Sequence, residues 1–190
     1  MHSLAPASPV ETRLAPGDWT LDHAHSSLAF SIRHLGLSKV HGRFDHFDAT
    51  LHVGAEPGQA SVEVSVDLAS IDTNNADRDT HLRSTDFFNV GEHPRMTFRS
   101  QAIAPSDDRY EVEGEVTLNG VTRALTLLAE FNGVLESPVD SRLHAGVSAV
   151  GEIRRSEFGI EFGLMPLGVD RLALADQVRF EVELQLVAPE

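Results

Sequence analysis

Ten histidines raise the question of metal chemistry in this sequence. His23 and His25 are two residues apart in a segment with strand character, so their side chains share one face, and Asp22 stands beside them. A zinc site requires three or four ligands that converge at about 2.0–2.3 Å, and the chain contains neither cysteine nor an H-E-x-x-H motif. We therefore interpret the histidines as polar residues at the rim of the fold and in hydrogen-bonded turns, and we predict no metal ion.

Two serines lie close in sequence to a histidine, as they could in a nucleophilic site. Ser26 follows His25 directly, and Ser84 follows His81 by three residues. Neither serine stands in the G-x-S-x-G turn that exposes a hydrolase nucleophile, and proximity in sequence is not a triad. Glycine-rich phosphate loops are absent as well. The sequence therefore assigns no catalytic residue and no cofactor.

The most polar cluster of the chain runs from Asp77 to Arg83. On a helix, Arg78 and Leu82 fall on one side and His81 lies near them. One interpretation directs Arg78 and His81 toward a ligand, where they would meet a polar head such as a phosphate or a quinone oxygen. In the other, salt bridges of Arg78 and Asp79 lock the helix to neighbouring strands, and we favour it because charges at helix ends usually serve capping.

Strands are the elements that would position these side chains. After Trp19 apolar residues recur at every second position, which is typical of strands with one buried face. The alternating series are Leu28, Phe30, Ile32; Phe47, Ala49, Leu51, Val53; Val62, Val64, Val66, Leu68; Met96, Phe98; Tyr110, Val112, Val116, Leu118; Leu125, Leu127, Ala129, Phe131; Ala145, Val147, Ala149, Ile153; and Val178, Phe180, Val182, Leu184, Leu186. About eight such strands in succession predict an all-β sandwich or closed barrel. An eight-stranded barrel is either just filled by its side chains or just wide enough for one slim ligand, and the alternation does not decide between these.

Three segments interrupt the alternation. Residues 75–84 predict a short helix that begins at an Asn or Asp cap and runs into residues 86–88, and it could lie across a barrel mouth. Asn119-Gly120 predicts a tight hairpin turn, and the Gly, Ser and Pro content around residues 132–142 predicts a longer loop. Residues 1–16 predict a flexible leader, so residues 17–190 would form a single domain.

Charge and composition exclude several classes of partner. The net charge is −14 at pH 7, and an acidic surface of that size repels phosphate backbones and anionic headgroups. We therefore expect no nucleic-acid partner, no tight docking on an acidic membrane and, without a long apolar stretch, no stable membrane insertion. The N-terminal residues have neither a positively charged start nor an apolar run, which predicts a cytoplasmic protein without a secretory signal.

The ordered motifs of the chain resemble those of the YceI-like family. They are Trp19-x-Leu21-Asp22-x-x-His25-Ser26, Phe30-Ser31-Ile32-x-His34-Leu35-Gly36, Gly42-x-Phe44 with Phe47, Ser70-Ile71-Asp72-Thr73-Asn74, Arg78-Asp79-x-His81-Leu82-Arg83-Ser84-x-Asp86-Phe87-Phe88, Pro94 with Phe98 and Ser100, Leu118-Asn119-Gly120-Val121-Thr122, and Arg155-x-x-Phe158-Gly159. Together they span residues 18–187. The resemblance implies an extended, lipocalin-like antiparallel barrel of eight strands with one short helix near residues 75–88, a long-chain lipid in its pore, and a homodimer.

The resemblance also implies which residues meet the lipid. They are Phe30, Ile32, His34, Phe44 and Phe47 from the first strands, Val64, Val66, Phe98 and Phe158 from later ones, Leu82, Phe87 and Phe88 near the helix, and Arg78 and His81 at a polar head. The implied function is to bind, shield or transport a polyisoprenoid, an isoprenoid quinone or a similar apolar lipid. Two alternatives stay open: an enzyme that folds and cyclises an apolar polyketide or terpenoid-like substrate in the barrel, and a barrel filled by its own side chains.

Overall fold

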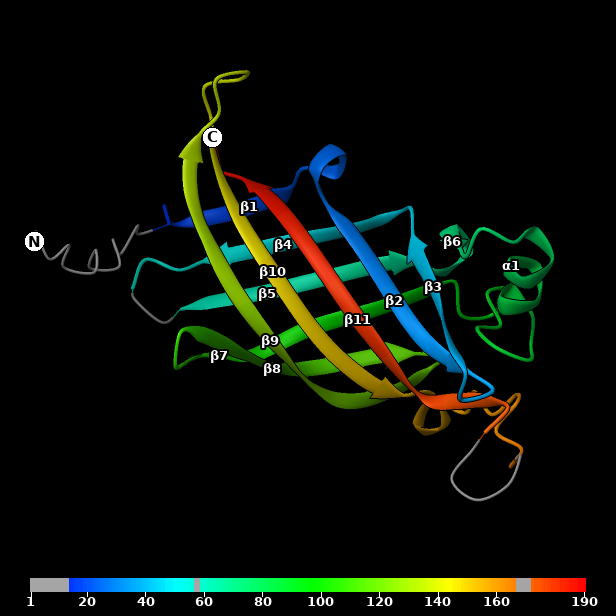
Figure 1. Ribbon diagram of the computed structural model, residues 1–190. Helices are drawn as coiled ribbons and strands as arrows, with labels where there is room; N and C mark the ends of the chain where they lie inside the picture. Colours follow the sequence, from blue (N-terminus) through cyan, green and yellow to red (C-terminus); the bar gives the residue numbers. More distant parts are fainter. Residues whose placement is uncertain (1–13, 57–58, 167–171) are drawn as a thin grey trace, which may run out of the picture.

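A computed structural model describes residues 14–56, 59–166 and 172–190 of the chain, which form one antiparallel sheet wrapped into a barrel (Figure 1). The strands are β1 (Gly17–Leu21), β2 (Ser27–His34), β3 (Ser38–Phe44), β4 (Phe47–Val53), β5 (Ala60–Asp67), β6 (Ile71–Asp72), β7 (Arg95–Ser106), β8 (Arg109–Leu118), β9 (Val121–Glu136), β10 (Leu143–Arg154) and β11 (Leu174–Val187). The helices are α1 (Ala76–Arg83) and three 3-10 helices, η1 (His23–His25), η2 (Leu68–Ser70) and η3 (Arg155–Phe158).

The barrel consists of eight long strands, three of which are interrupted. The sheet order is β1-β4-β5-β7-β8-β9-β10-β11-β2-β3-β6, and β1 also pairs with β11. Since β1 and β2 both pair with β11, they act as one strand with a break in the middle. The pairs β3–β4 and β5–β6 behave in the same way, because β4 pairs with β1 and β5 while β3 pairs with β2 and β6. The predicted closed, eight-stranded antiparallel barrel is therefore confirmed.

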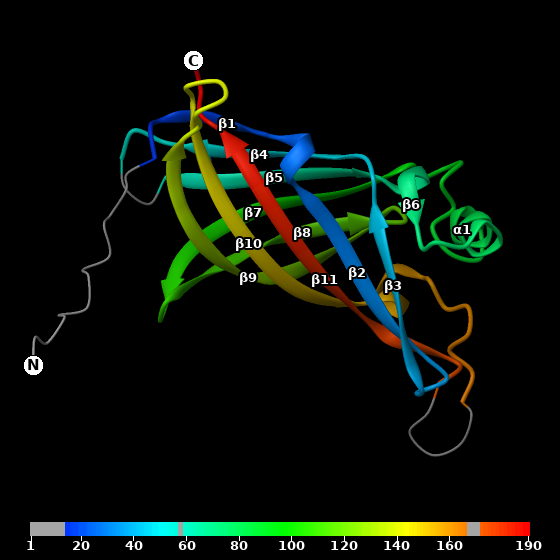
Figure 2. The same cartoon turned by 45° about the horizontal axis from the view of Figure 1, so that its top comes forward.

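The three interruptions lie beside one another, so neighbouring strands change direction at the same level of the barrel. At the first two η helices, the side chains of Asp22 and Asp67 accept hydrogen bonds from the backbone N–H groups of Ala24 and Ala69, both at 3.0 Å. The break between β3 and β4 lies beside η2, where the Asp45 N–H donates to the carbonyl of Ser70 at 3.1 Å. As a result β2 and β3 turn away from β1 and β4, which Figures 1 and 2 show as strands that splay apart beyond the break.

Helix α1 lies beside β6, at the end of the barrel to which the strands splay (Figure 2). The Asn75 side chain caps it by accepting the Arg78 N–H at 2.9 Å, as the sequence predicted. The helix ends at Arg83, within the predicted segment 75–84, because Ser84 is already extended and its N–H donates to the carbonyl of His81. None of the helices that the structure describes has the length and apolar character needed to cross a membrane.

Two predicted connections have different outcomes. Asn119 and Gly120 form the turn between β8 and β9 with φ angles of 51° and 72°, so the predicted tight hairpin is confirmed. The loop predicted over residues 132–142 is wrong in extent, because β9 continues to Glu136 and β10 begins at Leu143. Gly133, at φ 109°, lies where the register between β9 and β10 shifts, so these turn-forming residues make a bulge inside the strand.

Candidate functional site

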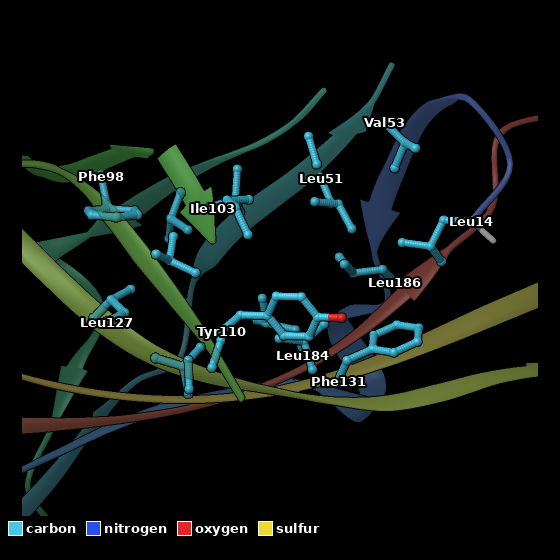
Figure 3. A pocket seen from close by; sticks show the side chains of 18 of the residues that line it. Leu14, Leu51, Val53, Phe98, Ile103, Tyr110, Leu127, Phe131, Leu184 and Leu186 are labelled. Carbon is cyan, nitrogen blue, oxygen red and sulfur yellow. The ribbon is translucent and has the colours of Figure 1, made fainter. Parts of the chain in front are cut away.

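An apolar cavity of about 600 Å³ fills one half of the barrel (Figure 3). Every strand from β4 to β11 except β6, together with β2, contributes side chains to its wall. The wall includes Leu28, Leu51, Val53, Val62, Val64, Val66, Met96, Phe98, Ile103, Tyr110, Val112, Val116, Leu125, Leu127, Ala129, Phe131, Val147, Ala149, Phe180, Val182, Leu184 and Leu186. The alternation of the strands brings these residues to the inner face, and their side chains, most of them Val, Leu, Ile and Ala, leave space that they do not fill.

One end of the cavity is bordered by residues 14–16 and by residues 54–56 and 59 of the β4–β5 turn. We call this the open end. Ala15, Pro16, Ala55 and Glu56 are exposed to solvent there and also border the cavity. In Figure 3 Leu14 and Val53 lie toward one side of the cavity, and Phe98 and Leu127 toward the other. The cavity therefore extends from the exposed residues 15–16 and 55–56 to the side on which Phe98 and Leu127 lie.

The opposite half of the barrel, which we call the closed end, is filled by aromatic side chains, α1 and η3. The rings of Phe30 and Phe44 have centroids 5.5 Å apart, and Phe88 from the segment after α1 lies 6.1 Å from Phe44. Leu68, Ile71 and Phe158 at this end are at most 1% exposed, and none of the three lines the cavity. The packed rings and aliphatic side chains block this end of the barrel to a ligand.

One glycine makes the aromatic packing possible. Gly42 on β3 pairs with Phe30 on β2, and a Cβ atom at position 42 would stand 2.4 Å from the Phe30 ring. The ring therefore lies directly against the glycine backbone, a contact that no other residue type allows. In the motif Gly42-x-Phe44, the glycine leaves room for the Phe30 ring, and Phe44 provides a second ring that packs against it.

Arg78 and its neighbours on α1 make hydrogen bonds to the chain beside them. Arg78 donates from Nε to the hydroxyl of Thr73 at 2.8 Å and from Nη2 to the Thr73 carbonyl at 2.7 Å. The buried carboxylate of Asp79 accepts the Thr73 backbone N–H at 3.0 Å and the Thr73 hydroxyl as well. Arg83 donates to the carbonyls of Ala69 and Ile71 at 2.8 and 2.9 Å. These contacts attach α1 to η2 and β6, but within the described residues Arg78 and Asp79 make them through hydrogen bonds and not through the predicted salt bridges.

A third arginine, Arg155, holds the segment between η3 and β11. Arg155 is only 4% exposed, and it donates to four backbone carbonyls at 2.7–3.0 Å: those of Ile160, Phe162, Leu174 and Ala175. Burial lowers the pKa of its guanidinium, while the nearby charge of Asp176 raises it. An arginine stays charged at neutral pH even so, and the five donors of its planar group suit a ring of carbonyls.

The residues predicted to meet a lipid divide between these two regions. Val64, Val66 and Phe98 line the cavity. Outside its wall lie Phe30, Ile32, His34, Phe44, Phe47, Arg78, His81, Leu82, Phe87, Phe88 and Phe158. Most of these fill the closed end, although His34 is exposed near the β2–β3 turn and Phe47 is buried at the start of β4. The strand breaks explain the difference, since they carry β3 and the part of β2 beyond Leu28 away from the cavity half of the barrel.

Five of the ten histidines pair with aspartates, each with a different one. The pairs are His23–Asp48, His25–Asp22, His52–Asp18, His81–Asp86 and His144–Asp140, with nitrogen–oxygen distances of 2.6–3.1 Å. The hydrogen bond from His25 lowers the pKa of Asp22, and its bond with the Ala24 N–H acts in the same direction. Among residues 14–56, 59–166 and 172–190, no group of three or more His, Cys, Asp or Glu side chains converges in a geometry for a metal ion.

The two serines considered as nucleophiles serve the backbone. The Ser26 hydroxyl accepts the Gln185 N–H at 2.9 Å and so joins β11 to the break between β1 and β2. The Ser84 hydroxyl donates to the His81 carbonyl at 2.7 Å at the end of α1. Both hydroxyls therefore serve local backbone contacts at points where a strand or a helix ends.

Sequence reasoning missed most of the cavity wall, although a signal for it was present. Leu51, Val62, Leu125, Phe131 and Leu184 all belong to alternating series that predicted a buried face. The predicted ligand residues were instead taken mostly from the family-like motifs, which stand largely at the closed end. The alternation of the aliphatic strands β4, β5 and β8–β11 was the better guide to the cavity.

An eight-stranded antiparallel barrel with an apolar internal cavity belongs to the broad class of lipocalin-like proteins. The YceI-like domain model matches residues 19–186, and the chain belongs to the YceI-like family. A UPF0312 protein of Staphylococcus aureus is 35% identical over 174 residues, which cover 91% of this chain and 99% of that protein. A UPF0312 protein of Pectobacterium atrosepticum is 39% identical over 147 residues, 77% of this chain and 76% of that one.

Solved structures show the same fold. The YceI protein of Campylobacter jejuni superposes with a TM-score of 0.70 at 29% identity, over 90% of this chain and 98% of that one. A domain from Saccharophagus degradans, described as polyisoprenoid-binding, superposes with a TM-score of 0.65 at 17% identity over the same shares of the two chains. At that identity the second comparison establishes the fold alone.

Proposed function

We propose that this protein binds a long-chain apolar lipid of the isoprenoid type inside the barrel and shields it from water. The observation that carries the proposal is the cavity, whose volume of about 600 Å³ lies within the usual range of about 300–1,000 Å³ for small-molecule sites. Its wall is formed almost entirely by aliphatic and aromatic side chains. The description of the Saccharophagus degradans domain as polyisoprenoid-binding supports the same class of ligand.

The driving force for binding is the removal of apolar surface from water. Each buried CH₂-sized group contributes about 0.8 kcal/mol, and the ordering of a flexible chain offsets part of this gain. A wall of Val, Leu and Ala side chains fixes no single orientation of a methyl branch, so selectivity along the tail would be loose. The closed end sets the depth to which the tail can extend, because Phe30, Phe44 and Phe158 fill the barrel beyond the cavity.

The direct test is mass spectrometry of an organic extract from freshly purified protein, together with native mass spectrometry of the intact complex. We expect one long-chain lipid per chain, or stoichiometric uptake of an added prenyl alcohol or prenyl quinone. A protein that carries no lipid and takes up neither compound would contradict the proposal.

A matched pair of variants assigns the binding to the cavity. Ala149 on β10 lines the cavity, whereas Ala124 on β9 is exposed on the outer face. A phenyl ring in place of the methyl group at position 149 would occupy ligand space, so Ala149→Phe should reduce lipid uptake at least tenfold while Ala124→Phe retains it. Circular dichroism and the melting temperature report whether both variants are folded, and equal uptake by two folded variants would place the lipid elsewhere.

A further inference from the structure

We infer that the hydroxyl group of Tyr110 forms a hydrogen bond with an oxygen atom of the lipid, so that the protein prefers an oxygenated chain, an alcohol or a carbonyl compound, to a pure hydrocarbon. This inference rests on the proposed function, because it concerns the ligand of the same cavity. It adds a polar contact, and therefore an orientation, to a site whose wall is mostly apolar and whose other polar residues are Glu56, Gln59, Thr97 and Glu130.

Tyr110 is an exception in the wall of the cavity. It is the only tyrosine of the chain, against ten phenylalanines, and it stands at an inward-facing position of β8. Among the described inward-facing strand residues that line the cavity, its side chain alone carries a hydroxyl group. Thr97 also borders the cavity, but it lies between the inward-facing Met96 and Phe98, so its side chain points outward. A phenylalanine at position 110 would fit an apolar wall equally well.

The hydroxyl of Tyr110 is free to meet a ligand. Within the part of the chain that the structure describes, its oxygen forms no hydrogen bond with another protein group. Figure 3 shows the hydroxyl pointing into the cavity, toward the side on which Phe131 and Leu186 lie and away from Phe98. The residue is 39% exposed, so water can solvate the group when no ligand is present.

The neighbouring residues leave room beside the ring. Ala129 on β9 pairs with Tyr110, and Ala149 on β10 pairs with Ala129, so two small side chains follow it across the sheet. Tyr110 is the second residue of β8, close to the β7–β8 turn, and Val116 lines the cavity six residues further along the strand. At about 3.3 Å per residue the two positions are about 20 Å apart. The lipid oxygen would therefore lie near the β7–β8 turn, with an apolar stretch of that length directed along β8 toward Val116.

The test compares an alcohol and a hydrocarbon of the same skeleton, phytol and phytane, with the wild-type chain and with Tyr110→Phe. A net hydrogen bond of ordinary strength corresponds to a change of about 3–10-fold in affinity. We expect the affinity for phytol relative to phytane to fall by this factor in Tyr110→Phe. Phe131→Leu, which alters the wall without changing a polar group, should leave the ratio as it is in the wild type.

A spectroscopic measurement separates a hydrogen bond from a change of shape. With a prenyl quinone bound, the carbonyl stretching band should lie at lower frequency in the wild type than in Tyr110→Phe. An unchanged affinity ratio and an unchanged band would overturn the inference and leave lipid binding intact. Failure of the wild type to bind phytol, phytane or the quinone would overturn the proposed function itself, and this inference with it.

Discussion

The two halves of this barrel are built from the same alternating strands but are filled in opposite ways. At the closed end, phenylalanine rings pack in tilted and edge-to-face pairs with centroids 5.5–6.1 Å apart, and arginines donate to backbone carbonyls. In the cavity half, valine, leucine and alanine side chains line an unfilled space of about 600 Å³. Both halves carry aromatic rings, since Phe98, Phe131 and Phe180 line the cavity. The difference lies in the segments that the strand breaks and turns bring into the closed end, α1 and η3 among them.

The comparison separates residues that stabilise the barrel from residues that shape its contents. A side chain at the closed end touches protein on all sides, so its removal leaves a void or an unpaired polar group. A side chain on the cavity wall already faces empty space on one side, so its removal enlarges a space that exists. Mutations in the two halves should therefore differ in whether they change stability or lipid binding.

The largest expected contrast concerns two phenylalanines. Phe158 is 1% exposed at the closed end, and Phe131 is half-buried on the cavity wall. Phe158→Ala should lower the free energy of unfolding by about 3–5 kcal/mol, the usual cost of a large-to-small change in a packed core. Phe131→Ala should cost about 1 kcal/mol and change lipid affinity instead. Urea unfolding measures the loss of stability in both variants. Equal losses would contradict the distinction between a packed closed end and an unfilled cavity.

A smaller effect is expected at the arginine that holds the segment after η3. Lysine at position 155 keeps the charge but lacks the planar group that reaches the four carbonyls of residues 160, 162, 174 and 175. Since carbonyls left without donors are costly, Arg155→Lys should lower the free energy of unfolding by about 2–3 kcal/mol. Lipid affinity measured on the folded variant should stay within about twofold, and a loss of binding without a loss of stability would contradict the structural role.

The smallest effect is local and concerns the β9–β10 turn. The N–H of Arg142 and the ring of His144 both donate to the Asp140 carboxylate, and together they lower its pKa to about 2. Because the pKa is lower in the folded protein than the ordinary value of about 3.9, these contacts stabilise the turn above that pH and lose their effect as the pH falls through about 2. An NMR titration of the carboxyl group checks the value. His144→Gln should raise it, whereas an ordinary pKa in the wild type would show that the contacts are absent in solution.

Homodimer formation and a cytoplasmic location stay predictions from the sequence. Analytical ultracentrifugation tests the first, and localisation of the natively expressed protein tests the second. The predicted leader, residues 1–16, lies outside the described residues except for residues 14–16, which border the cavity.

Particular elements show how far the sequence could be interpreted. The period-two series, such as Val62, Val64 and Val66, predicted strands and their buried faces because a strand alternates its side chains between two faces. Asn75 and the Asn119-Gly120 pair predicted a helix start and a hairpin because cap and turn geometry depend on local residue types. The family-like motifs of residues 70–88 were harder to interpret, because the same arginine and histidine could bind a lipid head or a backbone carbonyl.

Most of the strands, with their inner faces, could be predicted from local patterns, and the ordered motifs indicated the family and its eight-stranded barrel. The alternation did not predict β1 and β3, which have no alternating series of their own. The tertiary structure decided which inward-facing residues pack together and which enclose space. That outcome depends on three breaks in strands far apart in the sequence, at residues 22–26, 45–46 and 68–70, which come side by side only in the closed barrel. The closed end and the cavity have the same alternating sequence pattern, so the pattern does not distinguish them. The volume left between the strands depends on the geometry of the whole sheet.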